Sequence, residues 1–331
     1  MIPGVSVVIP LYNKGHCISR TLDSVLVQTY QNIEIIVIDD GSTDNGPEVV
    51  KTFKDPRITL ITQENKGPGA ARNAGLRRAV GKYIVFLDAD DEWAPNFLQE
   101  GVDFLNNNEE VSTISSGYYD TSRGDDEITS FWNRKGVLDG IYELSDDTHP
   151  EVAVHLLGYM IPCTTIAKRE IINKYGGFFD TYRCLYGEDA HLWFKIILNE
   201  KIAISRGKLV TIHREDSNLS SNLPGAHPIP PDLQDPGNIE IDCPTDKMNL
   251  LMKMLAIRAA DEAKHNAYFG LKTEAEQLLN EFCYSYKPNR YFTAKLYINI
   301  SFIIQHLRKN FYFVSCSRKI LRLCSRILEM T

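Results

Sequence analysis

The feature that most constrains the fold is an alternation of strand and helix patterns over the first hundred residues. Four short runs rich in apolar and β-branched residues are typical of strands buried on both faces, and they cover residues 5–10, 33–38, 58–62 and 83–87. Helical spacing or an alanine-rich composition predicts helices over residues 17–28, 46–54 and 69–79. This order predicts an α/β fold, with a doubly wound, mostly parallel sheet and helices on both faces. In such sheets ligands bind beyond the carboxyl ends of the strands.

The later chain is less regular. We expect a strand over 162–167, helices over 168–175 and 187–200, and another strand within 202–212. Residues 217–244 are rich in Pro, Gly, Asn and Ser, which predicts a structureless loop, lid or linker. The expected organisation is therefore one domain over 1–216, with halves of about 1–100 and 101–216, a flexible segment over 217–245, and a helical, basic extension over 246–331.

Composition excludes several classes of function. The 331 residues are 43% apolar and 24% charged, as in ordinary soluble globular proteins, and the net charge of −7 argues against general nucleic-acid binding. Seven scattered cysteines and a start without a basic leader predict reduced thiols in a cytoplasm. No stretch reaches the ~18 uncharged apolar residues that a membrane-spanning helix needs.

The charge is unevenly distributed. After position 286 the chain has nine Lys or Arg residues and one acid, Glu329. Over residues 317–328, helical spacing places apolar and basic side chains on different faces. A basic amphipathic helix suits an anionic membrane surface, so peripheral membrane binding is expected. A helix packed on the catalytic domain and a dimer contact are the open alternatives.

Three carboxylates directly follow the fourth expected strand: Asp88, Asp90 and Asp91. Clustered carboxylates repel one another and are costly to desolvate, which indicates a positive partner. Asp88 and Asp90 are two positions apart where the strand enters a turn, so both can point toward one ligand. Mg²⁺ or Mn²⁺ prefers oxygen ligands and is the kind of cation that such carboxylates bind. A solvated acidic turn is the alternative.

Four stretches, in this order and spacing, resemble the motifs of family 2 glycosyltransferases. They are VSVVIPLYN at 5–13, VIDDGSTD at 37–44, GAARNAG at 69–75 and FLDADD at 86–91, and the resemblance covers roughly residues 4–215. It implies the GT-A fold and transfer of a sugar from a nucleotide diphosphate, usually with inversion at the anomeric carbon. It also implies a divalent cofactor, Mn²⁺ or Mg²⁺, bound by an Asp-x-Asp motif.

The resemblance also implies roles for the residues at the strand ends. Asp90 is the expected direct metal ligand, Asp88 is expected near the ribose or the water shell of the metal, and Ala89 is expected at the nucleotide. Asp40 is expected to accept a hydrogen bond from the nucleotide base, with an Asx turn or a helix cap as the alternative. The base is expected to lie along Pro10, Leu11 and Tyr12.

Arg72 lies on a helix with small neighbours, Gly69, Ala70, Ala71 and Ala74. Small side chains let a ligand or another backbone approach closely, and a guanidinium suits a base or a diphosphate. We therefore expect Arg72 to contact the nucleotide. A surface ion pair is the alternative.

The catalytic base is expected at the start of the helix over 187–200. Gly187-Glu188-Asp189 resembles the family's Glu-Asp motif, which implies that Asp189 deprotonates the acceptor hydroxyl while Glu188 supports orientation or acceptor binding. Acids that only complement the helix dipole are the alternative. His213 is a candidate metal ligand, or else a structural histidine. The 217–244 stretch is expected to close over the donor and exclude water.

The expected function is therefore that of an inverting glycosyltransferase. It would move a sugar from a nucleotide-sugar donor, here a UDP-sugar, to a glycan or lipid-linked acceptor in cell-surface polysaccharide synthesis, at the cytoplasmic side of the membrane. A sugar-phosphate nucleotidyltransferase is one alternative, but it needs a glycine-rich basic loop where this chain has Leu-Tyr-Asn-Lys-Gly. A non-catalytic binding protein is another, although such a protein is expected to lose the acids of the site.

Overall fold

The computed structural model describes residues 2–122, 125–217 and 228–310 of the chain. Contacts divide these residues into two compact units. The first comprises the described residues up to 217 together with 230–245, and the second comprises 228–229 together with 246–310. Within the described part of the chain, no helix combines the length and the apolar character needed to cross a bilayer.

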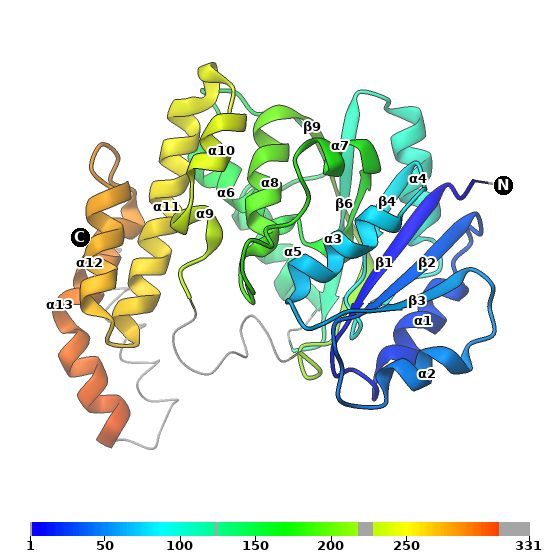
Figure 1. Ribbon diagram of the computed structural model, residues 1–331. Helices are drawn as coiled ribbons and strands as arrows, with labels where there is room; N and C mark the ends of the chain where they lie inside the picture. Colours follow the sequence, from blue (N-terminus) through cyan, green and yellow to red (C-terminus); the bar gives the residue numbers. More distant parts are fainter. Residues whose placement is uncertain (1, 123–124, 218–227, 311–331) are drawn as a thin grey trace. The chain divides into compact units, whose positions relative to one another are not determined.

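A nine-stranded sheet forms the centre of the first unit, with the strand order β3-β2-β1-β4-β8-β6-β9-β5 and with β7 paired to β9. The strands are β1 (Val5–Leu11), β2 (Ile33–Asp39), β3 (Ile58–Thr62), β4 (Tyr83–Phe86), β5 (Glu92–Trp93), β6 (Val111–Asp120), β7 (Gly140–Tyr142), β8 (Thr165–Lys168) and β9 (Lys201–Ile212). The strands β1 to β4 are mutually parallel, as β6 and β9 are, while β8 runs antiparallel between β4 and β6. The predicted α/β class is confirmed (Figure 1).

Helices cover both faces of this sheet. They are α1 (Ile18–Leu26), α2 (Gly46–Thr52), α3 (Pro68–Arg78), α4 (Phe97–Asn107), α5 (Asp125–Arg134), α6 (Pro150–Tyr159), α7 (Arg169–Lys174), α8 (Glu188–Asn199), α9 (Pro231–Gln234) and α10 (Gly237–Asp242). Figure 1 shows α1 and α2 on one side of β1–β3 and α3 on the other. The order of strands and helices predicted for the first hundred residues is present in the structure.

Alternate side chains of β1 enter two different cores, because successive residues of a strand point to opposite faces. Val7 belongs to the core that includes Leu22 of α1 and Leu98 of α4. Val8 points to the other face and meets Gly75 of α3, where an added Cβ would lie 2.2 Å from a methyl group of Val8. A glycine at this position therefore lets α3 lie directly on the sheet.

Pro10 lies on β1, a central strand of the sheet, at a point where its missing N–H interrupts no hydrogen bond of the β1–β4 pairing. The carbonyl of Val8 accepts a hydrogen bond from the N–H of Leu87, so β1 faces β4 at Val8 and again at Pro10. The β1–β4 register ends at Val8 and Phe86. Since Pro10 lies beyond that end, its missing N–H removes no bond of the ladder. The β1–β2 register, by contrast, continues to Leu11 and Asp39.

Two local predictions are corrected by the structure. Residues 162–164 form a 3₁₀ turn, and only Thr165–Lys168 is a strand, because Pro162 supplies no N–H and favours a first helical turn. The segment 217–245 was expected to lack regular structure, but its described part contains α9 and α10. Pro231 begins α9, and the buried side chains of Leu233 and Ile239 anchor the two short helices.

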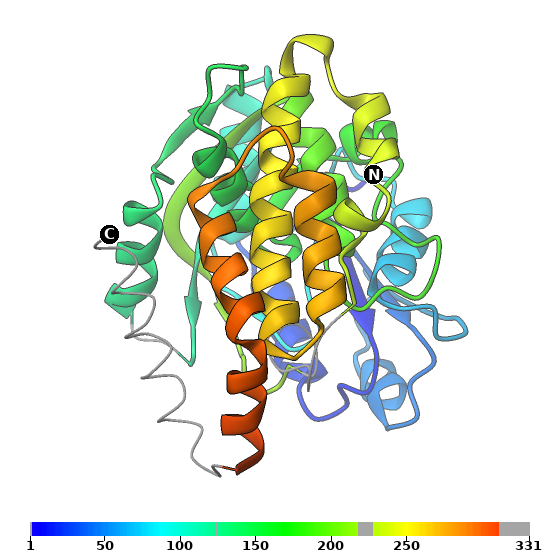
Figure 2. The same ribbon diagram turned by 90° about the vertical axis from the view of Figure 1, so that its left-hand side faces the viewer.

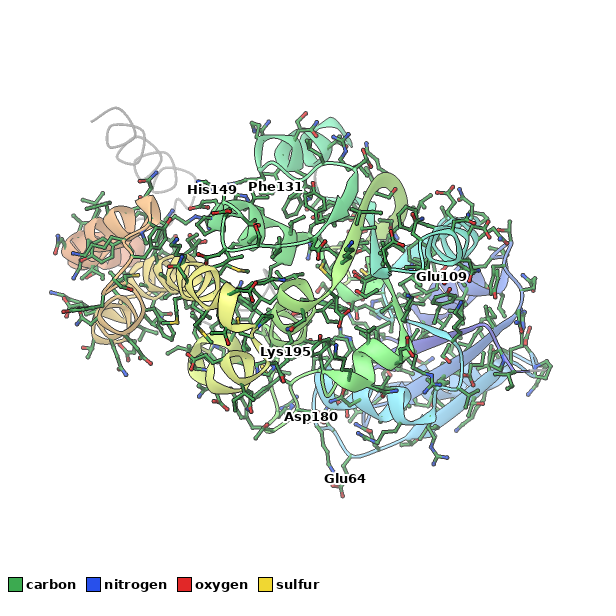
Figure 3. All side chains as sticks on the ribbon, turned by 90° about the horizontal axis from the view of Figure 1, so that it is seen from above. Glu64, Glu109, Phe131, His149, Asp180 and Lys195 are labelled. Atoms are coloured by element: carbon green, nitrogen blue, oxygen red, sulfur yellow. The ribbon has the colours of Figure 1, made fainter. Side chains whose placement is uncertain are left out.

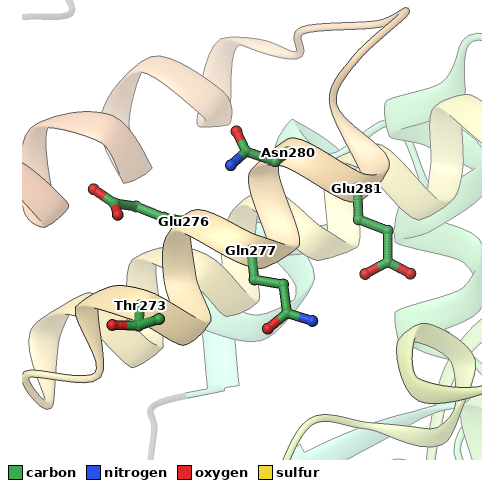
Figure 4. A pocket seen from close by; sticks show the side chains of 5 residues that line it. All are labelled: Thr273, Glu276, Gln277, Asn280 and Glu281. Atoms are coloured by element: carbon green, nitrogen blue, oxygen red, sulfur yellow. The ribbon is translucent and has the colours of Figure 1, made fainter.

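The second unit is helical. A 3₁₀ turn (Thr245–Lys247) leads into α11 (Met248–Tyr268), α12 (Lys272–Phe282) and α13 (Asn289–Asn310), which pack against one another (Figure 2). The expected helical extension is thus present, with a break at Gly270, whose φ is +89°. A hollow on α12 is lined by polar side chains of this one helix: Thr273, Glu276, Gln277, Asn280 and Glu281 (Figure 4).

Candidate active site

The carboxyl ends of β1, β2 and β4 form one edge of the sheet, since the three strands are parallel. Leu11 ends β1, Asp39 ends β2, and Asp88 follows β4 by two residues. The N–H of Asp40 donates to the carbonyl of Leu11, which ties the first two strand ends together. The sequence-predicted residues of the donor side therefore come from one edge.

Asp40 organises the loop between β3 and α3. Its carboxylate accepts three hydrogen bonds, from the Gln63 side chain (2.8 Å), the Lys66 N–H (3.0 Å) and the Gly67 N–H (2.9 Å). Glu64, in the same loop, points away from the sheet (Figure 3). A carboxylate offers about four acceptor positions, so one position of the buried Asp40 carboxylate is left after these three bonds. The cap-like alternative applies to Asp39, which accepts the N–H of Ser42 three residues on, and not to Asp40.

The turn after β1 presents one exposed aromatic ring. The Leu11 side chain is fully buried in the core, so only its backbone faces this edge. Tyr12 is 42% exposed and thus has a free surface for a planar ligand. Asn13, with a φ of +52°, fixes the turn by accepting the N–H of Thr43.

Arg72 is a buried bridge between two acids. Its side chain is 5% exposed, and its two terminal nitrogens contact Asp88 Oδ1 at 2.7 Å and Glu188 Oε1 at 2.6 Å. The guanidinium also lies 5.2 Å from the ring centre of Phe178. The alternative of a surface ion pair is therefore wrong: Arg72 connects the end of β4 to the start of α8, 116 residues from Glu188 in sequence.

Two of the three acids after β4 are buried, while the Asp88 side chain is 35% exposed. Asp90 is 8% exposed and Asp91 is 4% exposed. Burial raises the pKa of Asp90, the charge of Asp88 raises it further, and Lys14 counteracts part of the rise. Burial, followed by the charges of Asp88 and Asp90, also raises the pKa of Asp91 well above its usual range. Each carboxylate thus disfavours ionisation of the next, as expected of a site that is short of positive charge.

Glu188 and Asp189 begin α8 after Gly187, which adopts the left-handed conformation with a φ of +77°. Gly69 of α3 lets the segment before this helix come close, because a Cβ there would lie 2.3 Å from the carbonyl oxygen of Phe179 and 3.3 Å from Cγ of Glu188. Burial, and then the charge of Glu188, raise the pKa of Asp189 to about 7, while Arg72 opposes the rise. A carboxylate with such a pKa suits a general base at neutral pH.

His213 lies just after β9, with both ring nitrogens engaged. Its Nε2 is 2.6 Å from Glu92 Oε1 and its Nδ1 is 3.2 Å from Glu215 Oε1. Its backbone N–H donates to Asp91. The structure therefore places His213 beside the acidic cluster, but its imidazole does not join Asp88 and Asp90. These contacts match the structural alternative.

Sequence reasoning missed two cations of the site, Lys14 and Arg20. Lys14 Nζ contacts Asp90 Oδ2 at 2.5 Å, and Arg20 Nη2 contacts Asp216 Oδ2 at 2.7 Å. Lys14 follows the first strand in the Tyr-Asn-Lys-Gly turn, and that position at the carboxyl edge was the available signal. Arg20 carries no local signal, because its partners are 70 and 196 residues away in sequence.

The donor atoms after β4 fit a hard divalent cation. Among the described residues, ligand atoms of Asp88, Asp91 and Cys163 lie within 4.8 Å of one another. Carboxylate oxygens are the ligands that Mg²⁺ and Mn²⁺ prefer, and the mutual repulsion of the three acids favours an added cation. This set differs from the expected one: Cys163 stands in the place of Asp90, whose carboxylate contacts the Lys14 ammonium instead.

A family model described as glycosyl transferase family 2 matches residues 6–176. The chain is 34% identical over 222 residues to the Escherichia coli UDP-Glc:alpha-D-GlcNAc-diphosphoundecaprenol beta-1,3-glucosyltransferase WfgD. The aligned region covers 66% of this chain and 80% of WfgD. Other relatives are longer: the chain spans only 19% of an uncharacterized glycosyltransferase of Rickettsia felis.

Solved structures share the fold. S. aureus TarS 1-349 in complex with UDP-GlcNAc matches with a TM-score of 0.57 and 18% identity, over 91% of this chain and 81% of that one. The mannosyltransferase PcManGT from Pyrobaculum calidifontis, in complex with GDP-Man and Mn²⁺, matches with a TM-score of 0.54 and 18% identity. This match covers 99% of this chain and 81% of PcManGT. The mixed sheet with helices on both faces is the architecture these chains share. The family match over half of the chain and the match to most of WfgD lead to one conclusion: this protein belongs to glycosyl transferase family 2 and has the GT-A fold.

Proposed function

We propose that this glycosyltransferase transfers a sugar, with inversion, from a UDP-sugar to a hydroxyl of a lipid-linked glycan acceptor during cell-surface polysaccharide synthesis. The names of two similar proteins support the substrate classes: WfgD is named for UDP-Glc and a diphosphoundecaprenol-linked acceptor, and TarS is described with UDP-GlcNAc. Membership of the family favours this reaction over that of a nucleotidyltransferase and over a non-catalytic binding role.

The observation that carries the proposal is the chain of contacts from the strand-end acids to the start of α8. Asp88 is linked through Arg72 to Glu188, and Asp189 is the next residue. A nucleotide diphosphate bound at the strand ends would thus be connected, through Asp88, Arg72 and Glu188, to the neighbouring Asp189 carboxylate. The pKa of that carboxylate is about 7. Donor binding and acceptor deprotonation require such a pair of neighbouring sites.

We assign a role to each side chain. Tyr12 stacks on the base beside Pro10 and Leu11, and Asp40 uses its free acceptor position for a donor group of the base. Arg72 orients Asp88 and Glu188. Asp189 takes the proton from the acceptor hydroxyl while the new bond to the anomeric carbon forms and the bond to the diphosphate breaks. Attack from the face opposite the leaving group inverts the anomeric configuration.

The cofactor we propose is Mn²⁺ or Mg²⁺. Asp88, Asp90 and Asp91 supply the carboxylates that would hold it, and the description of PcManGT with GDP-Man and Mn²⁺ supports the choice. When bound, the cation supplies Lewis-acid stabilisation of the leaving diphosphate. In this proposal His213 does not bind the cation, because Glu92 and Glu215 contact its two ring nitrogens. It instead donates its backbone N–H to Asp91.

The C-terminal part is proposed to contact an anionic membrane surface from the cytoplasmic side, where a lipid-linked acceptor would be presented. In the described part, Tyr284 (89% exposed) and Phe292 (61% exposed) lie close in sequence to Lys287, Arg290 and Lys295. The expected amphipathic helix over 317–328 and the central part of the expected lid, 218–227, lie outside the described residues. The full chain should sediment with anionic vesicles at low salt and not with neutral ones. Recovery in the supernatant with both would contradict membrane binding.

The transfer itself is tested with purified protein, UDP-glucose or UDP-GlcNAc, Mn²⁺ and a polyprenyl-diphosphate-linked GlcNAc acceptor. We expect acceptor-dependent UDP release, loss of the activity in EDTA, and a β-linked product from the α-configured donor, identified by NMR. An α-linked product would contradict inversion. Full activity in EDTA would contradict the proposed metal dependence.

A further inference from the structure

Two cations reach the acidic edge of the sheet, Lys14 from the turn before α1 and Arg20 from α1, and they are held in different ways. Arg20 contacts backbone and peripheral groups: its Nη2 donates to the carbonyl of Asp90 and to Asp216 Oδ2, each at 2.7 Å. Its Nε lies 3.2 Å from Glu92 Oε1. None of these contacts uses the carboxylate of Asp90, so Arg20 leaves that carboxylate available.

Lys14 contacts the Asp90 carboxylate itself. Its Nζ lies 2.5 Å from Asp90 Oδ2, and both side chains are 12% exposed. The same ammonium donates to the backbone carbonyl of Asp216. Lys14 therefore covers an oxygen that the proposed metal site needs, and it links that oxygen to the segment after β9.

The side chain of Lys14 is suited to leave this position. Lysine carries a compact point charge on a flexible stem, whereas the planar guanidinium of arginine is fixed by several bonds at once. The neighbouring backbone would remain in place, because Thr21 Oγ1 and Cys17 Sγ also hold the carbonyl of Ala89. Removal of the Lys14 ammonium from Asp90 therefore requires a side-chain movement and not a rearrangement of the turn.

We propose that Lys14 is a built-in counter-cation that competes with the divalent metal for Asp90, so that metal binding displaces Lys14. The inference rests on the proposed metal site at Asp90. It gives a reason for coupling between metal and nucleotide: a displaced ammonium loses its carboxylate partner, and the diphosphate of the donor supplies a new anionic one. Two ligands that each favour the same displaced state of Lys14 bind cooperatively.

The test is a titration of the full-length protein with Mn²⁺, followed by calorimetry or by the EPR signal of free Mn²⁺, without and with UDP. Without nucleotide, Lys14→Gln should bind Mn²⁺ about tenfold more tightly than the wild type. Lys14→Arg keeps the positive charge and should stay near the wild-type affinity. Lys51→Gln, which removes the same charge from an exposed position on α2, should leave the affinity unchanged.

UDP provides the second readout. In the wild type, UDP should tighten Mn²⁺ binding strongly, and in Lys14→Gln this enhancement should shrink, because no ammonium has to be displaced. Thermal unfolding of each variant checks that it is folded. An unchanged or weaker Mn²⁺ affinity in Lys14→Gln would overturn the inference.

Asp90→Asn separates this inference from the proposed function. If Asp90→Asn loses Mn²⁺ binding while Lys14→Gln equals the wild type, the metal site stands and the role of Lys14 is refuted. If Asp90→Asn binds Mn²⁺ as well as the wild type, the metal assignment fails and takes the inference with it. Absence of Mn²⁺ binding in both the wild type and Lys14→Gln has the same consequence.

Discussion

The acids after β4 and the acids at the start of α8 are two carboxylate pairs with different surroundings. Asp88 and Asp90 each have a cationic partner, Arg72 and Lys14, and still raise the pKa of their neighbours. At α8, Glu188 shares Arg72, whereas Asp189 has no ion-pair partner among the described residues and accepts a bond from the N–H of Ala190. The acids after β4 thus have cations beside them, whereas at the start of α8 the Asp189 carboxylate has a pKa of about 7.

The difference indicates a division of labour. A cluster of carboxylates that raise one another's pKa suits a cation, while a carboxylate without an ion-pair partner and with a pKa of about 7 suits proton transfer near neutral pH. Arg72 contacts an acid of each group, Asp88 and Glu188, and so fixes the position of one group relative to the other. Each prediction below removes one part of this arrangement.

The largest effect is expected for Asp189→Asn, which keeps the shape of the side chain but cannot accept a proton. We expect kcat to fall about 1000-fold, the range of a lost general base, with little change in UDP affinity. Steady-state kinetics and UDP titration measure both quantities. Asp180→Asn, an exposed acid in the loop before α8, is the matched control (Figure 3). A kcat within a few-fold of the wild type in Asp189→Asn would end its assignment as the base.

Arg72→Met would uncouple the two groups. The substitution leaves Asp88 and Glu188 without their shared cation, so we expect the free energy of unfolding to fall by about 3 kcal/mol. Activity should fall about 100-fold in the protein that remains folded, because both carboxylates lose their orientation. Urea unfolding and kinetics measure the two effects. Arg77→Met, on the exposed side of α3, should stay within about 0.5 kcal/mol of the wild type. A stable, active Arg72→Met protein would show that the two groups are independent.

The pH dependence should report Asp189. Its base form is needed, so kcat/KM should rise with pH, with a midpoint near 7 and about a tenfold loss for each pH unit below it. The free energy of unfolding should change in the opposite direction and fall as the pH rises. Because the folded pKa lies above the ordinary value of 3.8, the proton favours the folded state, and this contribution is lost as the pH rises toward 7. The Asp189→Asn protein should lack that loss. A flat rate profile through pH 7 would contradict a base with this pKa.

The smallest effect is expected at the base-stacking surface. Tyr12→Ala should weaken UDP binding about fivefold, corresponding to about 1 kcal/mol of lost stacking, and Tyr12→Phe should retain it. Calorimetric titration distinguishes the two variants. Equal affinities in all three proteins would place the base elsewhere along the edge.

Sequence patterns were sufficient for the parts of the fold that are local. The β-branched runs and the polar residues after them locate β1 to β4, and parallel strands bring Tyr12, Asp40 and Asp88 to one edge. The burial of Arg72 was not visible in the sequence, because α3 has small residues on all sides and no apolar stripe. Its place depends on the contact of α3 with α8.

Contacts across long sequence separations were also out of reach. Lys14 and Arg20 meet Asp216 only because β9 pairs with β5, which brings residues 213–216 beside the acids after β4. The two short helices α9 and α10 were missed because a Pro- and Gly-rich composition resembles that of a loop, and the buried Leu233 and Ile239 are too few to form a periodic pattern.

The central claim is that the acids after β4 hold a cation that in turn holds the diphosphate. The most direct test is the affinity for UDP with and without Mn²⁺, measured for the wild type and Asp90→Asn. We expect Mn²⁺ to tighten UDP binding to the wild type by about 100-fold, corresponding to about 2.8 kcal/mol, and to have almost no effect on Asp90→Asn. The same Mn²⁺-dependent gain in both proteins would contradict the account.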